Sequence, residues 1–174
     1  MDEEKFRKFL IRAKTSIFAA TNVEERMFPP TEGNSFPDGS KSLVLTYNED
    51  HLSYVVTYFG LNPFWQYDVV EANGEIVWII SCHGSLTIAP KHDSYLEQAY
   101  YCIREALAYP TDHPDCRHYH PSRGPGMHHI PGTHLWYYNG CEGDLGSFKG
   151  IEWLESFDNE VVYKANYHGG FIKR

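Results

Sequence analysis

The chain has 174 residues, of which 42% are hydrophobic and 16% aromatic, a composition typical of one globular domain rather than a disordered chain. The net charge is −8 and the 15 lysine and arginine residues are scattered, so direct nucleic-acid binding is not expected. No apolar run reaches about 18 residues and the N-terminus is acidic, so we expect a cytoplasmic protein with no membrane partner.

The N-terminal residues predict an amphipathic helix. Apolar side chains recur at helical spacing from Phe6 to Ile17, with lysine and arginine residues between them, and the pattern ends near Ala20. Residues 21–40 contain three prolines and two glycines and predict a long loop.

Four β-rich runs follow and predict an antiparallel meander. They lie at residues 43–47, 52–59, 64–72 and 75–82. Asn73-Gly74 joins the last two runs, and this dipeptide is preferred in a type I′ turn because both central residues need positive φ.

A second helix is predicted over residues 94–109. It opens with a capping box, Ser94-x-x-Glu97, and ends before Pro110. A second loop rich in proline and glycine covers residues 110–133, and three further strands are predicted near residues 135–139, 148–156 and 160–168.

The two halves of the chain repeat one pattern. At spacings of 84 and then 85 residues, residues of the first half have similar counterparts in the second: Tyr54 and Tyr138, Phe64 and Phe148, Asp68 and Glu152, Trp78 and Tyr163, His83 and His168. The sequence therefore predicts an α+β fold of two repeated helix-plus-antiparallel-meander units (α-β4-α-β3) packed about a pseudo-two-fold axis. We expect one domain, 1–174, with repeat 1 at about 1–90 and repeat 2 at about 91–174.

Hairpin register assigns the side chains to two faces. A two-residue turn at Asn73-Gly74 pairs Val69 with Trp78 and Asp68 with Ile79. The predicted core face is Trp65, Tyr67, Val69, Ile76, Trp78, Ile80 and Cys82. The opposite, mixed face is Phe64, Gln66, Asp68, Val70, Val77, Ile79, Ser81 and His83. In the second half a three-residue turn assigns Ile151, Trp153, Tyr163, Ala165 and Tyr167 to the core, and Phe148, Glu152, Leu154, Val162, Lys164, Asn166 and His168 to the mixed face.

The mixed face suggests a site because each half places an acid with a histidine on it. Asp68 with His83, and Glu152 with His168, could do acid–base chemistry or line a ligand pocket. The alternative is a half-exposed sheet face with a plain Glu152–Lys164 cross-strand pair.

Arg123 could clamp a carboxylate or phosphate from its Gly/Pro-held loop, or make a structural contact instead. The ligand-binding candidates are Asp68, His83, Arg123, Tyr138, Glu152 and His168. No catalytic residue or cofactor is identified.

A histidine-rich loop is the one candidate for a metal. It contains His113, Cys116, His118, His120, His128, His129 and His134, and imidazole and thiolate suit borderline metals. Because the spacing matches no known zinc motif, a solvated loop is the alternative and no metal is assigned; His113, Cys116, His118 and His120 are the candidates if one binds.

Short motifs resemble an uncharacterised bacterial domain family, one of the domains of unknown function, found alone or C-terminal to Xre-type helix-turn-helix regulators. They are Arg123-Gly124-Pro125, Tyr138-Asn139-Gly140 ahead of Gly143-Asp144, Phe148-x-Gly150-x-Glu152 and Tyr167-His168-Gly169-Gly170, with a weaker echo in Tyr58-x-Gly60, Phe64, Asp68 and Trp78. The first half departs from the pattern where Trp65-Gln66 replaces Lys149-Gly150. The resemblance implies a sensing module functionally linked to a helix-turn-helix regulator.

Three functions follow as hypotheses. The first is a small-ligand-binding or sensor domain with its pocket between the two repeats. The second is a metal-dependent or His/carboxylate-dependent hydrolase. The third is a protein-interaction module that uses the outer face of the sheet. Binding of a small molecule is favoured over catalysis.

Overall fold

The computed structural model describes residues 2–19, 42–60, 62–87, 93–109 and 123–172, which form an α+β fold. Within these residues there are two helices and one antiparallel sheet of eight strands. The elements in chain order are α1 (Glu3–Phe18), β1 (Ser42–Glu49), β2 (Leu52–Phe59), β3 (Phe64–Ala72), β4 (Glu75–Leu86), α3 (Asp93–Ala108), β5 (Met127–His129), β6 (Leu135–Asp144), β7 (Ser147–Ser156) and β8 (Val161–Phe171).

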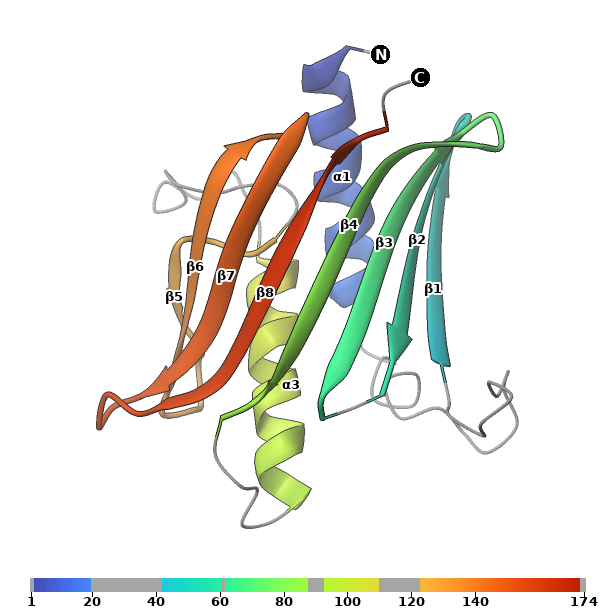
Figure 1. Ribbon diagram of the computed structural model, residues 1–174. Helices are drawn as coiled ribbons and strands as arrows, with labels where there is room; N and C mark the ends of the chain where they lie inside the picture. Colours follow the sequence, from blue (N-terminus) through green and yellow to red (C-terminus); the bar gives the residue numbers. More distant parts are fainter. Residues whose placement is uncertain (1, 20–41, 61, 88–92, 110–122, 173–174) are drawn as a thin grey trace.

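The sheet places the two halves of the chain side by side. Its strand order is β1-β2-β3-β4-β8-β7-β6-β5, so the long strands β4 and β8 pair in the middle. Figure 1 shows that α1 and α3 lie on the same face of the curved sheet, and the two helices contact each other. The core therefore lies between this face and the helices, and the opposite face carries neither of the two helices.

Helix α1 confirms the first predicted helix. The Asp2 side chain caps it by accepting hydrogen bonds from the backbone N–H groups of Glu4 and Lys5 at 2.9 and 3.1 Å. Its buried stripe repeats every three or four residues: Phe6, Phe9, Leu10, Ala13, Lys14, Ile17 and Phe18. In the part of the chain that the structure describes, no helix is long and apolar enough to cross a membrane.

The turn between β3 and β4 is as predicted, but the register beyond it is not. Asn73 and Gly74 have φ values of 53° and 80°, as a type I′ turn requires. Glu71 pairs with Ile76, but Val70 pairs with Trp78, so Val77 is an extra residue on β4. This β-bulge shifts every later pair by one residue.

The bulge inverts the predicted faces of β3. Phe64, Gln66, Asp68 and Val70 are buried, whereas Trp65 is 46% exposed. On β4 the predicted core face was right beyond the bulge, where Trp78, Ile80 and Cys82 are buried, and wrong before it, where Ile76 is 47% exposed. Asp68 pairs with Ile80, not Ile79, and Asp68 and His83 lie on opposite faces, so the predicted acid–histidine pair was wrong.

The second hairpin repeats this deviation. Leu154 pairs with Tyr163 and Glu155 pairs with Val161, which leaves Val162 as the extra residue on β8. Glu152 and Leu154 are buried, so the predicted faces of β7 were also wrong, although Tyr163, Ala165 and Tyr167 of β8 are buried as predicted. Glu152 pairs with Ala165, so the alternative Glu152–Lys164 cross-strand pair does not form.

The second half has one strand more than predicted. Met127–His129 forms β5 inside the segment predicted as loop, at the edge of the sheet, where Met127 pairs with Tyr138. Three residues are too short to show a period of two, so the sequence pattern gives no signal for this strand.

Candidate functional site

A cluster of polar side chains is buried between the helices and the sheet. Five of its members are at most 1% exposed: Lys14, Gln66, Asp68, Arg123 and Glu152. They come from α1, β3, the segment before β5, and β7. Burying so many polar groups is costly unless each is hydrogen-bonded, so the partners decide what the cluster can do.

Arg123 and Glu152 form the centre of the cluster. The Arg123 Nε donates to Glu152 Oε2 at 2.8 Å, and Nη2 donates to Oε1, which makes a bidentate pair. Tyr137 and Tyr163 donate to the same carboxylate at 2.7 and 3.0 Å. Burial alone raises the pKa of Glu152, but the Arg123 charge and these hydrogen bonds outweigh it and hold the pKa below its usual value.

Arg123 also reaches β3, on the far side of β4 and β8. Its Nη1 donates to Gln66 Oε1 at 3.0 Å, and Gln66 Nε2 donates to Asp68 Oδ1 at 2.6 Å. The Tyr54 hydroxyl donates to Asp68 Oδ2 at 2.6 Å. Burial raises the pKa of Asp68, although the Arg123 charge and both hydrogen bonds oppose the rise.

Lys14 brings α1 into the cluster. Its Nζ donates to the Arg123 carbonyl oxygen at 2.8 Å. Burial, and then the Arg123 charge, lower the pKa of Lys14 well below its ordinary value. One helix and two distant strands are thus joined through a single arginine.

Side chains from β6 and β8 hold the Arg123-Gly124 backbone in place. Asn139 Nδ2 donates to the Gly124 carbonyl at 2.9 Å, and the Tyr167 hydroxyl donates to Asn139 Oδ1 at 2.6 Å. A Cβ at Gly124 would lie 2.7 Å from the Tyr137 ring, so glycine is required there. These contacts give a structural reason for the Arg-Gly-Pro and Tyr-Asn-Gly motifs.

The charged groups of the cluster are hydrogen-bonded to one another and buried, which makes the cluster a poor reaction centre. The hydrogen bonds above engage both carboxylates and the Arg123 guanidinium, and the nearest thiol, Cys82, has its pKa raised to about 12 by burial. A protonated, buried thiol is a weak nucleophile at neutral pH. We therefore interpret the cluster as a support for the fold and for the surface next to it.

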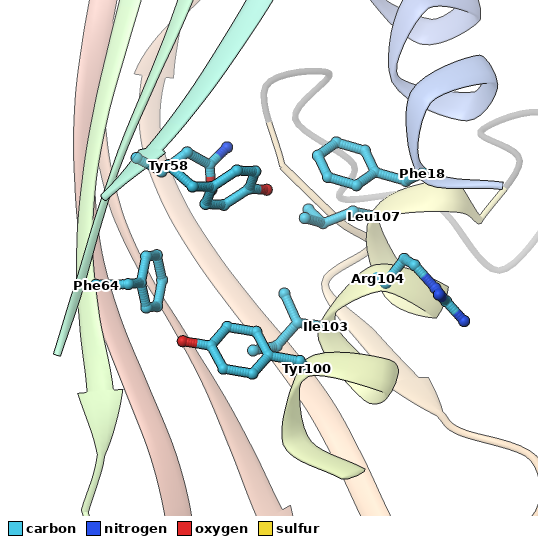
Figure 2. A pocket seen from close by; sticks show the side chains of 8 residues that line it. Phe18, Tyr58, Phe64, Tyr100, Ile103, Arg104 and Leu107 are labelled. Carbon is cyan, nitrogen blue, oxygen red and sulfur yellow. The ribbon is translucent and has the colours of Figure 1, made fainter. Parts of the chain in front are cut away.

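A pocket lies beside the cluster, between α3, the end of α1, and strands β2 and β3. Its interior has a volume of about 10 Å³, room for about one water molecule, and the wider mouth is open to solvent. Its lining, drawn in Figure 2, is Phe18, Tyr58, Phe64, Gln66, Tyr100, Ile103, Arg104 and Leu107. We call it the α3 pocket. A shallower hollow, too small to hold a water molecule, adjoins it along Phe64, Tyr100 and Ile103.

The polar groups of the α3 pocket differ in what they contact. Gln66 is held by Arg123 and Asp68, as described above. The Tyr58 hydroxyl points into the pocket (Figure 2) and has no hydrogen-bond partner among the residues that the structure describes; burial raises its pKa well above the usual value. The Arg104 guanidinium points away from the pocket, over the Tyr101 ring at 5.5 Å and 3.9 Å from Glu105.

The structure brings together three of the six predicted ligand-binding residues. Asp68, Arg123 and Glu152 share the buried cluster. The other three lie outside it: His83 stacks on Trp65 at 4.1 Å, Tyr138 stacks on Trp153 at 5.1 Å, and His168 is exposed. The convergence predicted for His83 and His168 was wrong because it depended on a register without bulges, and Tyr138 lies outside because Tyr137 faces inward on β6.

Sequence reasoning also missed several members of the site. Tyr137, rather than Tyr138, takes the inward position on β6. Gln66 and Tyr54 were not selected because neither residue type signals chemistry alone. Lys14 did carry a signal, since it interrupts the apolar stripe of α1 one turn after Leu10.

The metal candidates His113, Cys116, His118 and His120 lie outside the described residues. Among the residues with described positions, no group of three or more His, Cys, Asp or Glu could hold a metal ion. The remaining histidines of that loop lie against aromatic rings: His128 against Tyr109 at 4.0 Å, His129 against Trp136 at 4.9 Å, and His134 against Phe157 at 5.3 Å.

Comparison with known families gives one match. Residues 56–172 fit the family described as a domain of unknown function, DUF5680. The chain belongs to this family. The DUF5680 match starts within β2 and ends just beyond β8, so it includes Gln66, Asp68, Arg123 and Glu152, and it contains all of α3. No curated protein matches the chain.

Proposed function

We propose that this DUF5680 chain is a small-ligand-binding domain of the sensor type rather than an enzyme, and that its ligand binds in the α3 pocket. The observation that carries the proposal is the pocket itself. Its walls are mostly aromatic and aliphatic, and the hydroxyl groups of Tyr58 and Tyr100 point inward from β2 and α3 (Figure 2). Concave apolar sites with a few oriented polar groups are the usual form of small-molecule sites.

We further propose that the fold arose by duplication, with repeats of about 1–90 and 91–174 related by a pseudo-two-fold axis between β4 and β8. Three observations support it: the strand order, which has the same form from either edge of the sheet; the bulges at Val77 and Val162; and a tyrosine that donates to a buried acid in each half, Tyr54 to Asp68 and Tyr137 to Glu152. The second tyrosine is one residue from Tyr138, the counterpart of Tyr54 by sequence spacing. The α3 pocket would then lie between repeats, since α3 belongs to the second and β2–β3 to the first.

Hydrogen bonds of the buried cluster connect the pocket to α1 and β7. Gln66 lines the pocket and also accepts a hydrogen bond from Arg123, which in turn contacts Lys14 and Glu152. A ligand that binds one arrangement of Gln66 better than another would shift the balance between them, as a sensor requires. In the proposed role the readout passes to a helix-turn-helix regulator.

The binding function is tested with a variant that fills the pocket. Ile103 lines both hollows, so Ile103→Phe should abolish the stabilisation that small aromatic compounds such as benzamide give to the wild type. Ile172→Phe, at an exposed position, is the control and should keep it. Thermal unfolding with and without millimolar benzamide measures the effect; equal stabilisation of both variants would exclude the pocket as the site. The hydrolase and protein-interaction hypotheses stay predictions.

A further inference from the structure

We propose that the edge strand β1 pairs with β1 of a second copy of this chain, so that two eight-stranded sheets join into one continuous sheet. The two strands run antiparallel about a two-fold axis that passes through Thr46. This interaction surface lies apart from the α3 pocket and does not depend on ligand binding. Three properties of β1 carry the proposal: its position at the edge, its unprotected sequence, and the match of its side chains to a second copy of themselves.

β1 is a long, regular strand at the edge of the sheet. It has eight residues, and within the described part of the chain β2 is its one strand neighbour (Figure 1). All eight residues pair with β2 in a register without a bulge. In an antiparallel ladder, alternate residues direct their N–H and C=O groups away from the neighbouring strand. β1 therefore presents a row of donors and acceptors with the spacing that another strand requires.

The sequence of β1 lacks most of the features that protect an edge strand from pairing. Proteins protect such edges with short strands, proline, lysine, inward-pointing charges or bulges. β1 contains no proline, lysine or arginine, and its one charged residue, Glu49, ends the strand in an ion pair with Arg12. The opposite edge differs, because β5 has only three residues. Of the two edges, β1 is thus the one suited to pair with another strand.

The side chains of β1 match those of a second copy. A two-fold axis perpendicular to the sheet keeps the helix-covered faces of both copies on one side, and centring it on Thr46 places the two threonines opposite each other. Leu45 then lies opposite Tyr47 of the second copy, and Val44 opposite its Asn48. Threonine pairs and pairs between aliphatic and aromatic side chains are favourable across antiparallel strands, and this register brings no like charges together.

Burial at the edge agrees with this arrangement. Leu45 is 6% exposed and belongs to the core, whereas Tyr47 packs against Phe9, with ring centroids 6.0 Å apart, and is only partly buried. Leu45 of a second copy would cover the rest of Tyr47 and continue the core across the interface. Because each copy contributes a single strand, the contact is smaller than a standard interface, and we expect a micromolar dissociation constant.

Sedimentation velocity of the full chain from about 1 to 200 μM tests the proposal. We expect the wild type to change from one chain to two over this range. Thr46→Lys places two like charges opposite each other at the axis, and Thr46→Glu does the same with the other sign. Each should weaken dimerisation at least about tenfold. Thr46 is exposed, so neither substitution alters the core.

A mixture of the two variants gives the sharpest result. Because lysine then lies opposite glutamate, equal amounts of Thr46→Lys and Thr46→Glu should form the dimer again. The matched control is Asn166→Lys, which adds a lysine at an exposed position on the same face of the sheet, in β8, four strands from β1. It should leave the monomer–dimer equilibrium unchanged.

The outcomes distinguish β1 pairing from other contacts. A wild type that stays a single chain at the highest concentration would overturn the proposal. So would dimers that persist in both Thr46 variants, or dimers that only Asn166→Lys disrupts, because these results place the contact elsewhere, such as on the outer face of the sheet. Dimers that are lost in each variant and restored by mixing would support β1 pairing, since unfolded variants would not recover on mixing.

Discussion

Arg123 and Glu152, 29 residues apart in the chain, form a bidentate ion pair in which the two side chains are 1% and 0% exposed. The protein contains a second pair of the same chemistry at its surface, where Arg12 donates to both oxygens of Glu49 and the side chains are 49% and 30% exposed. The two pairs differ chiefly in burial, so they allow the contribution of the central pair to be measured against an internal standard.

Replacing Arg123 with methionine should destabilise the fold strongly. The substitution leaves the Glu152 carboxylate buried without its counter-charge, and breaking a buried pair in this way typically costs about 3–5 kcal/mol. Equilibrium unfolding in urea measures the change. The control, Arg12→Met, should cost about 1 kcal/mol or less because its pair is exposed. Equal losses in the two variants would show that the buried cluster does not stabilise the fold.

Lys14 should make stability depend on alkaline pH. Its pKa is lowered in the folded state and is ordinarily 10.5, so between these values the unfolded chain binds a proton that the folded chain does not. Stability therefore rises with pH in this window, by up to about 1.4 kcal/mol per pH unit. Urea unfolding from about pH 7 to 8 measures the slope, because at higher pH the thiols of the unfolded chain ionise while burial keeps Cys82 and Cys102 protonated in the fold, which opposes the rise.

The slope should be smaller in Lys14→Met, because the group that titrates is gone. Lys8→Met removes an exposed lysine from the same helix, whose partner is Glu4, and should keep the wild-type slope. If Lys14→Met and the wild type have parallel pH profiles, the lysine is not the source of the dependence.

Gly150 should be intolerant of alanine, because Tyr167 fills the space beside it. A Cβ at this position would lie 2.2 Å from the ring carbon Cζ of Tyr167, whose hydroxyl holds Asn139. Overpacking of this kind costs about 1–3 kcal/mol. The neighbouring strand offers a matched control: at Gly140 the nearest atom to a Cβ is 3.9 Å away, so Gly140→Ala should cost far less. Thermal unfolding compares the two, and similar losses would contradict the packing described for Tyr167.

Deleting Val77 should be tolerated, whereas deleting Ile79 should not. Val77 is the bulged residue, so its removal lets Glu71–Ile76 and Val70–Trp78 follow each other as regular pairs. The deletion should lower the free energy of unfolding by about 2 kcal/mol, because it removes one backbone hydrogen bond to Ile172 and one partly buried side chain. Deleting Ile79 instead moves Ile80 and Cys82 to the other face or, if the bulge closes, turns the buried Trp78 outward, and either change disrupts the core. Circular dichroism and urea unfolding compare the two variants. An Ile79 deletion variant that is as stable as the Val77 deletion variant would contradict the register described for β3 and β4.

The sequence predicted both described helices, the meander of the first half and the Asn73-Gly74 turn, since each has a local signal. It did not predict the bulges, because Val77 and Val162 look like ordinary strand residues. On β3 the more apolar set, Trp65, Tyr67 and Val69, is the set facing outward. Gln66 faces inward because Arg123, 57 residues later, binds it, and no local pattern contains that information.

The candidate site was predictable only in its charged centre. Asp68 and Glu152 were selected as acids beside histidines and Arg123 as a possible anion clamp, and the structure places these three in one buried cluster without the histidines. The α3 pocket was not predictable, because it depends on how α3 packs against β2 and β3. That packing is set by long-range contacts such as Phe64 with Tyr100, whose rings lie 6.1 Å apart.

The most direct test of the account is a methyl NMR titration of the isoleucine- and leucine-labelled protein with benzamide. Binding in the α3 pocket predicts saturable shifts of the Ile103 and Leu107 methyl signals, while the exposed Ile76 and Ile172 signals stay in place. Shifts confined to Ile76 or Ile172, with Ile103 and Leu107 unchanged up to the solubility limit of benzamide, would contradict the claim that this domain binds small molecules between α3 and the sheet.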